Sequence, residues 1–85
     1  MSPKLHIRMH APQTARVTQY DRRQMKTYIR LLDAAAANVE WADAAHEILG
    51  LDSTDQHARA CWQSHLNRAR WMTEFGYKQL IQDRN

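Results

Sequence analysis

Apolar side chains return every three or four positions through most of this chain, the repeat that places them on one face of a helix. The first such stretch predicts a helix that begins near Thr18, with Asp21 three residues later in the capping-box position. We expect this helix to run to about Ala37 and to stop at Asn38. Its predicted apolar face consists of Met25, Tyr28, Ile29, Leu32, Ala35 and Ala36.

A short helix and a long helix are predicted to follow. Residues 41–49 form the short one, ended by Gly50 as its C-terminal cap, with a buried stripe of Trp41, Ala44, Ala45, Ile48 and Leu49. The long helix begins among the possible N-caps at residues 52–55 and is interrupted at Gly76. Its apolar positions are Ala58, Cys61, Trp62, His65 or Leu66, Ala69, Met72 and Phe75. A final apolar turn or short helix holds Tyr77, Leu80 and Ile81.

Residues 1–17 show a different, strand-like pattern in which apolar and polar side chains alternate. A lone strand has no partner in this sequence, so the segment is either an extended arm docked on a surface or a mobile one. We expect a flexible N-terminal arm over residues 1–17 and one domain over residues 18–85.

Composition supports a small helical fold. The chain of 85 residues is long enough for one domain, and two glycines and two prolines are too few for a turn-rich β protein. The predicted fold class is all-α, a domain of three to four helices. The lone Cys61 cannot form an intramolecular disulfide, and no long apolar run suggests a signal sequence or membrane span. We therefore expect a cytoplasmic protein with no membrane partner.

The charges alternate in blocks along the chain. Residues 1–30 are basic, residues 31–58 carry acidic but no basic side chains, and the remainder is basic again. The net charge of +3 suggests nucleic acid as a partner, because clustered Lys and Arg bind phosphates. The first basic block includes a candidate phosphate- or partner-binding face, which can equally be only solvated. That possible secondary basic face is Arg22, Arg23, Lys26 and Arg30.

The short helix, the Gly50 turn and the long helix resemble a helix-turn-helix, whose second helix enters the DNA major groove. The match is imperfect, since aligning Gly50 with the usual turn glycine puts Gln56 and Arg59 at apolar positions. The predicted DNA-facing turns also carry Asp52 and Asp55, and carboxylates repel phosphates. DNA binding through this face is therefore not expected, and the acids can be an ordinary solvated surface.

Three side chains spaced by four, His57, Cys61 and His65, fall near one face of the long helix and resemble part of a metal site. No clear fourth ligand exists, and a buried thiol and a hydrogen-bonded histidine are commoner at apolar positions. A catalytic thiolate needs an exposed, electropositive setting and an orienting third group. We expect no metal, no cofactor and no enzymatic activity. Trp71 lies off the main stripe, so it either packs under the C-terminal turn or is an exposed interface anchor.

Two stretches together resemble a known family. They are the run from Arg30 to Ala34 followed by residues 41–50, and the run from Leu66 to Arg70 followed by residues 76–81. They look like the proteobacterial helix-turn-helix-variant domain shared by RovC-type regulators of type VI secretion and FseA-type regulators of conjugative-element transfer. The resemblance covers roughly residues 20–82, and the chain is similar to the stand-alone members, the QseM-type antiactivators of integrative and conjugative elements. Among matching positions, Arg68, Arg70 and Lys78 keep the basic character of the family's C-terminal segment.

The resemblance implies a function. The protein would repress excision and transfer of a conjugative element by binding and inhibiting transcriptional activators, a LuxR-type quorum-sensing regulator and an FseA-type activator. We expect a monomer whose protein-binding residues are Arg59, Gln63, Arg70, Trp71 and Lys78. The alternative is a small DNA-binding regulator in which the long helix is the recognition helix and reads DNA through Arg59, Gln63, Asn67 and Arg70.

Overall fold

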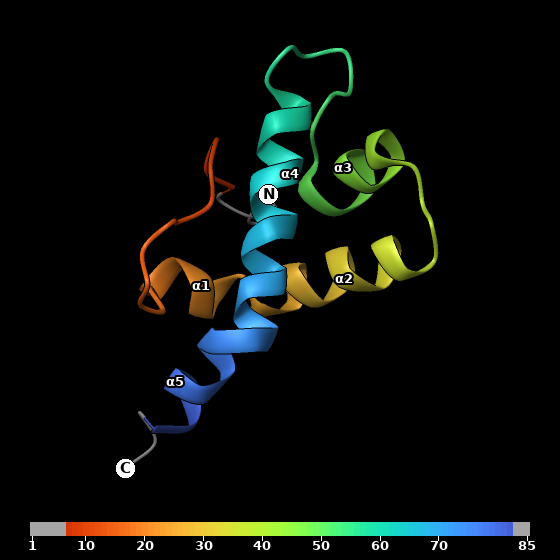
Figure 1. Cartoon of the computed structure of the whole chain (residues 1–85). Coiled ribbons are helices and arrows are strands. Elements are labelled where there is room, and N and C mark those ends of the chain that lie inside the picture. The colour runs from red at the N-terminus through yellow and green to blue at the C-terminus, as the bar shows by residue number, and fades with distance from the viewer. Residues whose placement is uncertain (1–6, 83–85) are drawn as a thin grey trace, which may run out of the picture.

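Helices make up the regular structure of the chain (Figure 1). The computed structural model describes residues 7–82, with the side chain of residue 82 left aside, and in that part there is no strand. The predicted all-α class is confirmed. The helices are α1 (Gln19–Arg23), α2 (Met25–Ala36), α3 (Trp41–Leu49), α4 (Ala58–Trp71), the π-helical segment η1 (Met72–Gly76) and α5 (Tyr77–Gln82).

Helix α4 is the axis of the molecule, and α2 and α3 pack against it while η1 and α5 continue it (Figure 1). The core lies along α4 in two clusters. One joins Leu31 of α2 and Leu66 of α4 to the apolar face of α3, with the half-buried Trp62 packed against it. The other joins Tyr28 of α2 to Ala69 and Met72 at the far end of α4. The predicted stripes of α3 and α4 are therefore confirmed in their main positions.

The predicted capping box opens the first helix as expected. The Thr18 hydroxyl accepts the N–H of Asp21 at 3.1 Å, and Asp21 Oδ2 accepts the N–H of Thr18 at 2.9 Å. The prediction of one continuous helix is wrong, because a turn at Gln24 separates α1 from α2. Gln24 has φ −100° and ψ 16°, and neither glycine nor proline marks the position. A local hydrogen bond accompanies the break: the buried Gln24 side chain accepts from the Thr27 hydroxyl at 2.9 Å.

Several predicted core positions lie on the surface instead, among them Ile29, Ala36 and Phe75. Ile29 is 53% exposed, and Leu31, which was not assigned to the apolar face, is 1% exposed. Helix α2 is therefore rotated so that Leu31 meets α3 and α4. Phe75 is 55% exposed because the π-helical segment places an extra residue in one turn, and Gly76 faces inward in its place.

Helix α3 has the predicted bounds and cap. Gly50 adopts φ 69°, a left-handed conformation, and its N–H donates to His46 O while Leu51 N–H donates to Ala45 O. Helix α4 begins at Ala58, later than predicted. The expected N-caps close turns inside the connection, since Asp52 Oδ1 accepts the N–H of Thr54 and Asp55 Oδ1 that of His57. The connection at residues 50–57 is thus longer than the three or four residues of a standard helix-turn-helix.

Residues 7–17 form an extended segment, which we call the docked arm, lying against α4 (Figure 1). The N–H of Ala11 donates to Ser64 Oγ of α4 at 3.0 Å, and further bonds reach α1 and α5. Of the two alternatives, a docked or a mobile arm, the structure has residues 7–17 in the docked form, in which side chains of other helices satisfy backbone groups of the arm. Residues 1–6 of that segment, and residues 83–85 of the predicted domain, lie outside the described residues.

Candidate protein-binding site

A buried ion pair fixes the position of α4 relative to α1. Arg68 grips the Asp21 carboxylate with two hydrogen bonds, from Nε to Oδ1 at 3.0 Å and from an η nitrogen to Oδ2 at 2.7 Å, and both side chains are buried. Thr18 and Tyr28 also donate to this carboxylate. Burial opposes ionisation of Asp21, yet the bonds from Arg68, Thr18 and Tyr28 hold its pKa below the ordinary value. Arg68 is therefore not a surface charge, contrary to its assignment among basic matching positions.

The same guanidinium holds the docked arm. Arg68 donates to two arm carbonyls, and Gln79 of α5 makes two more bonds to the arm through its side-chain amide. The arm atoms are the carbonyl oxygens of Thr14, Ala15 and Arg16 and the N–H of Val17, at 2.7 to 2.8 Å. Side chains from α4 and α5 thus take the place of a partner strand.

The side chains considered as metal ligands have other roles. His65 is buried with both ring nitrogens occupied, Nε2 at 2.6 Å from Tyr20 Oη and Nδ1 at 2.8 Å from Cys61 O. His57 is exposed and lies near Gln56. No group of three His, Cys, Asp or Glu side chains suited to a metal occurs in residues 7–82. The Cys61 thiol donates to Arg8 O at 3.3 Å, and burial raises its pKa, which disfavours the thiolate.

An exposed polar stripe runs along the outer face of α4. Arg59, Gln63, Asn67 and Arg70 recur at helical spacing there, and only Gln63 is half-buried. Gln63 Nε2 donates to Asn67 Oδ1 at 3.0 Å, while the Arg59 guanidinium lies 5.6 Å from the Trp41 ring. The structure therefore brings three of the predicted interface residues, Arg59, Gln63 and Arg70, onto one face.

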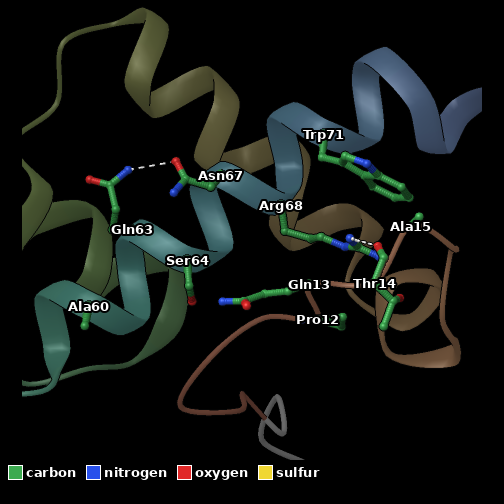
Figure 2. A pocket seen from close by; sticks show the side chains of 10 residues that line it. All are labelled: Pro12, Gln13, Thr14, Ala15, Ala60, Gln63, Ser64, Asn67, Arg68 and Trp71. Atoms are coloured by element: carbon green, nitrogen blue, oxygen red, sulfur yellow. Dashed lines mark hydrogen bonds between the residues drawn. The ribbon is translucent and has the colours of Figure 1, made fainter.

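Beside this stripe, the docked arm and α4 enclose a hollow of about 600 Å³ (Figure 2). Gln63 and Trp71 line it, so it takes in two predicted interface residues. Trp71 is half-buried, with the Arg68 guanidinium 3.8 Å from its ring, and so combines packing with an accessible edge. Lys78 is exposed on α5 and does not line the hollow. The hollow is also lined by residues that the sequence analysis did not assign to a binding site: Pro12, Gln13, Thr14, Ala15, Ala60 and Ser64.

The two charged surfaces inferred from sequence are both solvent-exposed. The acidic face of α3 and the following connection is made of Asp43, Glu47, Asp52 and Asp55. The basic face of α1 and α2 is made of Arg22, Arg23, Lys26 and Arg30. Opposite charges therefore occupy separate helices instead of one mixed surface.

Sequence reasoning also missed an apolar groove between α2 and the C-terminal helices. Its walls include Ile29 from α2 and Tyr77 from α5, which are 53% and 61% exposed. The signal was present in the sequence, because the apolar positions of residues 25–36 are more than one buried face needs.

The structure is that of a small all-α domain with exposed polar, charged and apolar surfaces. None of the helices in the described residues is both long and apolar enough to cross a membrane. Comparison with protein-family models, with curated proteins and with solved structures gives no match to this chain.

Proposed function

We propose that this protein is a cytoplasmic antiactivator: it binds a transcriptional activator through protein contacts and occludes it, without a cofactor or a reaction of its own. In keeping with the family resemblance, the proposed targets are a LuxR-type quorum-sensing regulator and an FseA-type activator, so that binding represses transfer of a conjugative element. The observation that carries the proposal is the acidic face of α3 and of the connection that leads into α4.

The position of that face argues against DNA as the target. In a helix-turn-helix, the first turns of the second helix approach base edges and phosphates. Here the connection into α4 exposes Asp52 and Asp55, and α3 adds Asp43 and Glu47. Two like charges 4 Å apart repel by about 1 kcal/mol even in water, and no counterion release compensates carboxylates. A protein partner with basic side chains fits this face better than a phosphate backbone does.

The docked arm is a second argument. An α-helix with its side chains is about 10–12 Å across and already fills a major groove about 12 Å wide. Arm residues 12–15 lie beside α4 and share the hollow with Gln63 and Trp71 (Figure 2). The docked arm would have to enter the major groove together with α4, and the two side by side are wider than α4 alone. A protein surface has no such fixed width.

The polar stripe and the hollow suit a protein partner. Trp and Arg are enriched among residues that dominate binding energies at protein interfaces. Trp71 is held by Arg68 at one face, which limits the side-chain entropy lost on binding, and Arg70 lies next to it in sequence. We propose this stripe, with Trp71 at its edge, as the surface that meets the activator.

The test combines two binding measurements. First, the purified protein is titrated at low salt against duplex DNA from its own genetic element, with fluorescence anisotropy as the readout. We expect only weak, sequence-independent binding; saturable binding to one sequence would refute the proposal. Second, activators encoded beside the protein are co-purified with it, and their promoters are followed by a reporter. Capture of an activator and loss of reporter signal are expected, and failure to capture any of them would count equally against the proposal.

A charge-reversal variant locates the surface. Arg70→Glu changes an exposed side chain on α4 and should weaken capture of the activator, while the matched control Arg16→Glu, at an exposed arginine of the docked arm, should not. Equal capture by both variants would remove the α4 stripe from the interface.

The DNA-binding alternative has one observation in its favour. Arg59, Gln63, Asn67 and Arg70 do form a continuous exposed stripe on α4, and Arg and Gln are side chains that read bases. The same DNA titration decides between the two functions, because a recognition helix would lose sequence preference in Gln63→Ala.

A further inference from the structure

The apolar groove between α2 and the C-terminal helices is an exposed apolar feature that the proposed function leaves unused. It runs between Met25, Ile29 and Leu32 on α2 and Met72, Tyr77 and Leu80 on the other wall. Two of its wall residues, Ile29 and Tyr77, are more than half exposed. Ile81 lies four residues after Tyr77, on the same face of α5, and is 47% exposed, so the apolar surface continues past the groove. Exposed apolar surface of this extent marks binding sites.

The size of the groove indicates what kind of group enters it. Its volume is about 260 Å³, slightly below the range of about 300–1,000 Å³ that small-molecule sites occupy. Its lining is almost entirely apolar, with Thr73 as the one polar side chain apart from the tyrosine hydroxyls. The Tyr28 hydroxyl donates to Asp21 and is not offered to a ligand. Such a groove accepts a few apolar side chains presented by a larger partner.

Helices on both sides of the groove favour a helix as the bearer of those side chains. An amphipathic helix places anchors at positions i, i+3, i+4 and i+7 into a groove of this type. The part of α2 that lines the groove runs from Met25 to Leu32, about 12 Å, which matches roughly two turns of a docked helix.

The charge around the groove selects the polar face of that helix. Lys26 and Arg30 are four residues apart on α2 and flank Ile29, and both are exposed. Lys78 is exposed next to Tyr77 on the opposite wall. The exposed acids on these walls are Asp33 at the end of α2 and Glu74 in η1. Because Lys26, Arg30 and Lys78 outnumber these two acids, the rim of the groove has a net positive charge, and it complements an acidic partner.

The same charges argue against a second copy of this chain. A symmetric dimer that joined groove to groove would bring the same surface of both copies together. Lys26 and Arg30 of one copy would then approach those of the other, and like charges at an interface are unfavourable.

We propose that the groove between α2 and α5 binds an amphipathic helix of a partner protein, with apolar anchors between Ile29 and Tyr77 and acidic side chains against Lys26, Arg30 and Lys78. This inference deepens the proposed function and rests on it in taking the partner to be a protein. It assigns the protein a second binding surface, separate from the outer face of α4.

The probe is a fluorescein-labelled synthetic helix of about 18 residues, about 27 Å long, with leucines on one face and glutamates on the other. Its counterpart carries lysines in place of the glutamates. Binding to the full-length protein is measured by anisotropy, and the site is mapped by amide NMR shifts. We expect saturable binding of the acidic helix, shifts at the amides of Ile29, Leu32, Thr73 and Tyr77, and markedly weaker binding of the lysine helix.

Variants test the two parts of the site separately. Ile29→Asp should weaken binding about tenfold, the equivalent of about 1.4 kcal/mol, since it places a charge among the anchors. Val39→Asp is the matched control, because Val39 is also an exposed β-branched residue but lies outside the groove. Lys26→Glu combined with Arg30→Glu should weaken binding of the acidic helix and strengthen that of the lysine helix. Circular dichroism confirms that each variant is folded.

Several results would overturn the inference. The inference is wrong if the acidic helix, at its highest soluble concentration, causes no shifts at the groove amides. Equal binding of the two helices would remove acidic partners as the occupant. Concentration-dependent shifts at the same amides without any peptide would assign the groove to a second copy.

These outcomes are separable from those of the proposed function. The peptide titration needs no activator, so it succeeds or fails whatever the activator experiments show. If Ile29→Asp loses the peptide but still captures an activator, the groove is not that activator's site and the antiactivator role stands. If activator capture fails but the acidic helix binds in the groove, the groove stands and its partner is a protein of another class.

Discussion

The sharpest stability prediction concerns Arg68→Met. This change removes the guanidinium that holds Asp21 through two hydrogen bonds and that binds two carbonyls of the docked arm. Asp21 would remain buried with only the Thr18 and Tyr28 donors. Removing one partner of a buried ion pair costs about 3–5 kcal/mol, because the other charge stays without compensation. A domain of 85 residues has a total stability of only about 4–13 kcal/mol.

Arg68→Met should therefore lose a large part of the free energy of unfolding. The assay is equilibrium urea unfolding followed by far-UV circular dichroism and by tryptophan fluorescence, which also reports loss of the Arg68 stack on Trp71. Arg70→Met is the matched control, since Arg70 is exposed two residues further along α4, and it should change stability by less than about 0.5 kcal/mol. Arg68→Lys keeps the charge but not the two-pronged geometry and should lie in between.

A double-mutant cycle separates the ion pair from general packing. Asp21→Asn alone leaves Arg68 buried and uncompensated, so it should also be costly. The double variant should lose clearly less than the sum of the two single changes, because neither charge is left alone. The reasoning is refuted if Arg68→Met stays within about 1 kcal/mol of the wild type, or if the two changes are additive.

Three further predictions use local features. Burial lowers the pKa of His65 below its value of about 6.5 in the unfolded chain. Just below pH 6.5 the unfolded chain therefore binds a proton at His65 that the folded protein does not bind. The contribution of neutral His65 to stability is thus complete above about pH 6.5 and declines as the pH falls below that value. Urea unfolding between about pH 7.5 and 5.5 should show that the free energy of unfolding falls by at most about 1.4 kcal/mol per pH unit. This pH dependence should be weaker in His65→Gln, and an unchanged slope in that variant would refute the assignment of the effect to His65. Gly50→Ala forces a side chain into a φ of 69° and should cost about 1–2 kcal/mol in the same assay, whereas Gly50→Asn should cost less, and equal losses would contradict this cause. Cys61 should react with a thiol reagent only slowly in the native protein, and Ser64→Ala, which removes an acceptor for the docked arm, should speed the reaction; rapid labelling of the wild type would show an open arm.

Signals carried by a few consecutive residues were predicted well. The capping box of Thr18 and Asp21, and the α3 helix with its Gly50 cap, involve atoms within about one helical turn of each other. Local sequence therefore determines them, and the structure has them where the sequence places them. Helical periodicity likewise predicted the buried stripe of α4 as far as Met72.

Contacts between distant residues could not be predicted in the same way. Ile29 and Leu31 are both apolar, and only the positions of α3 and α4 determine which of them is buried. The π-helical segment changes which side chains after Trp71 face the core, and no residue type in the sequence indicates such a segment. The periodicity of a regular α-helix therefore predicted a buried Phe75, which is exposed in the structure. For the candidate site, the exposed stripe of α4 follows from periodicity, but the hollow beside it needs the docked arm.

The docked arm also changes how the positive charge of the sequence should be interpreted. A net charge of +3 and an arginine-rich long helix suggest a DNA-binding surface only if those side chains face solvent. Arg68 does not, because it is neutralised by Asp21, 47 residues away, and binds the protein's own backbone. Gln79 has the same kind of role on α5. Arg68 and Gln79 are thus part of the fold, while Arg59 and Arg70 stay exposed in a mixed polar stripe of α4 next to an aromatic edge. That composition is closer to a protein interface than to a phosphate-binding surface.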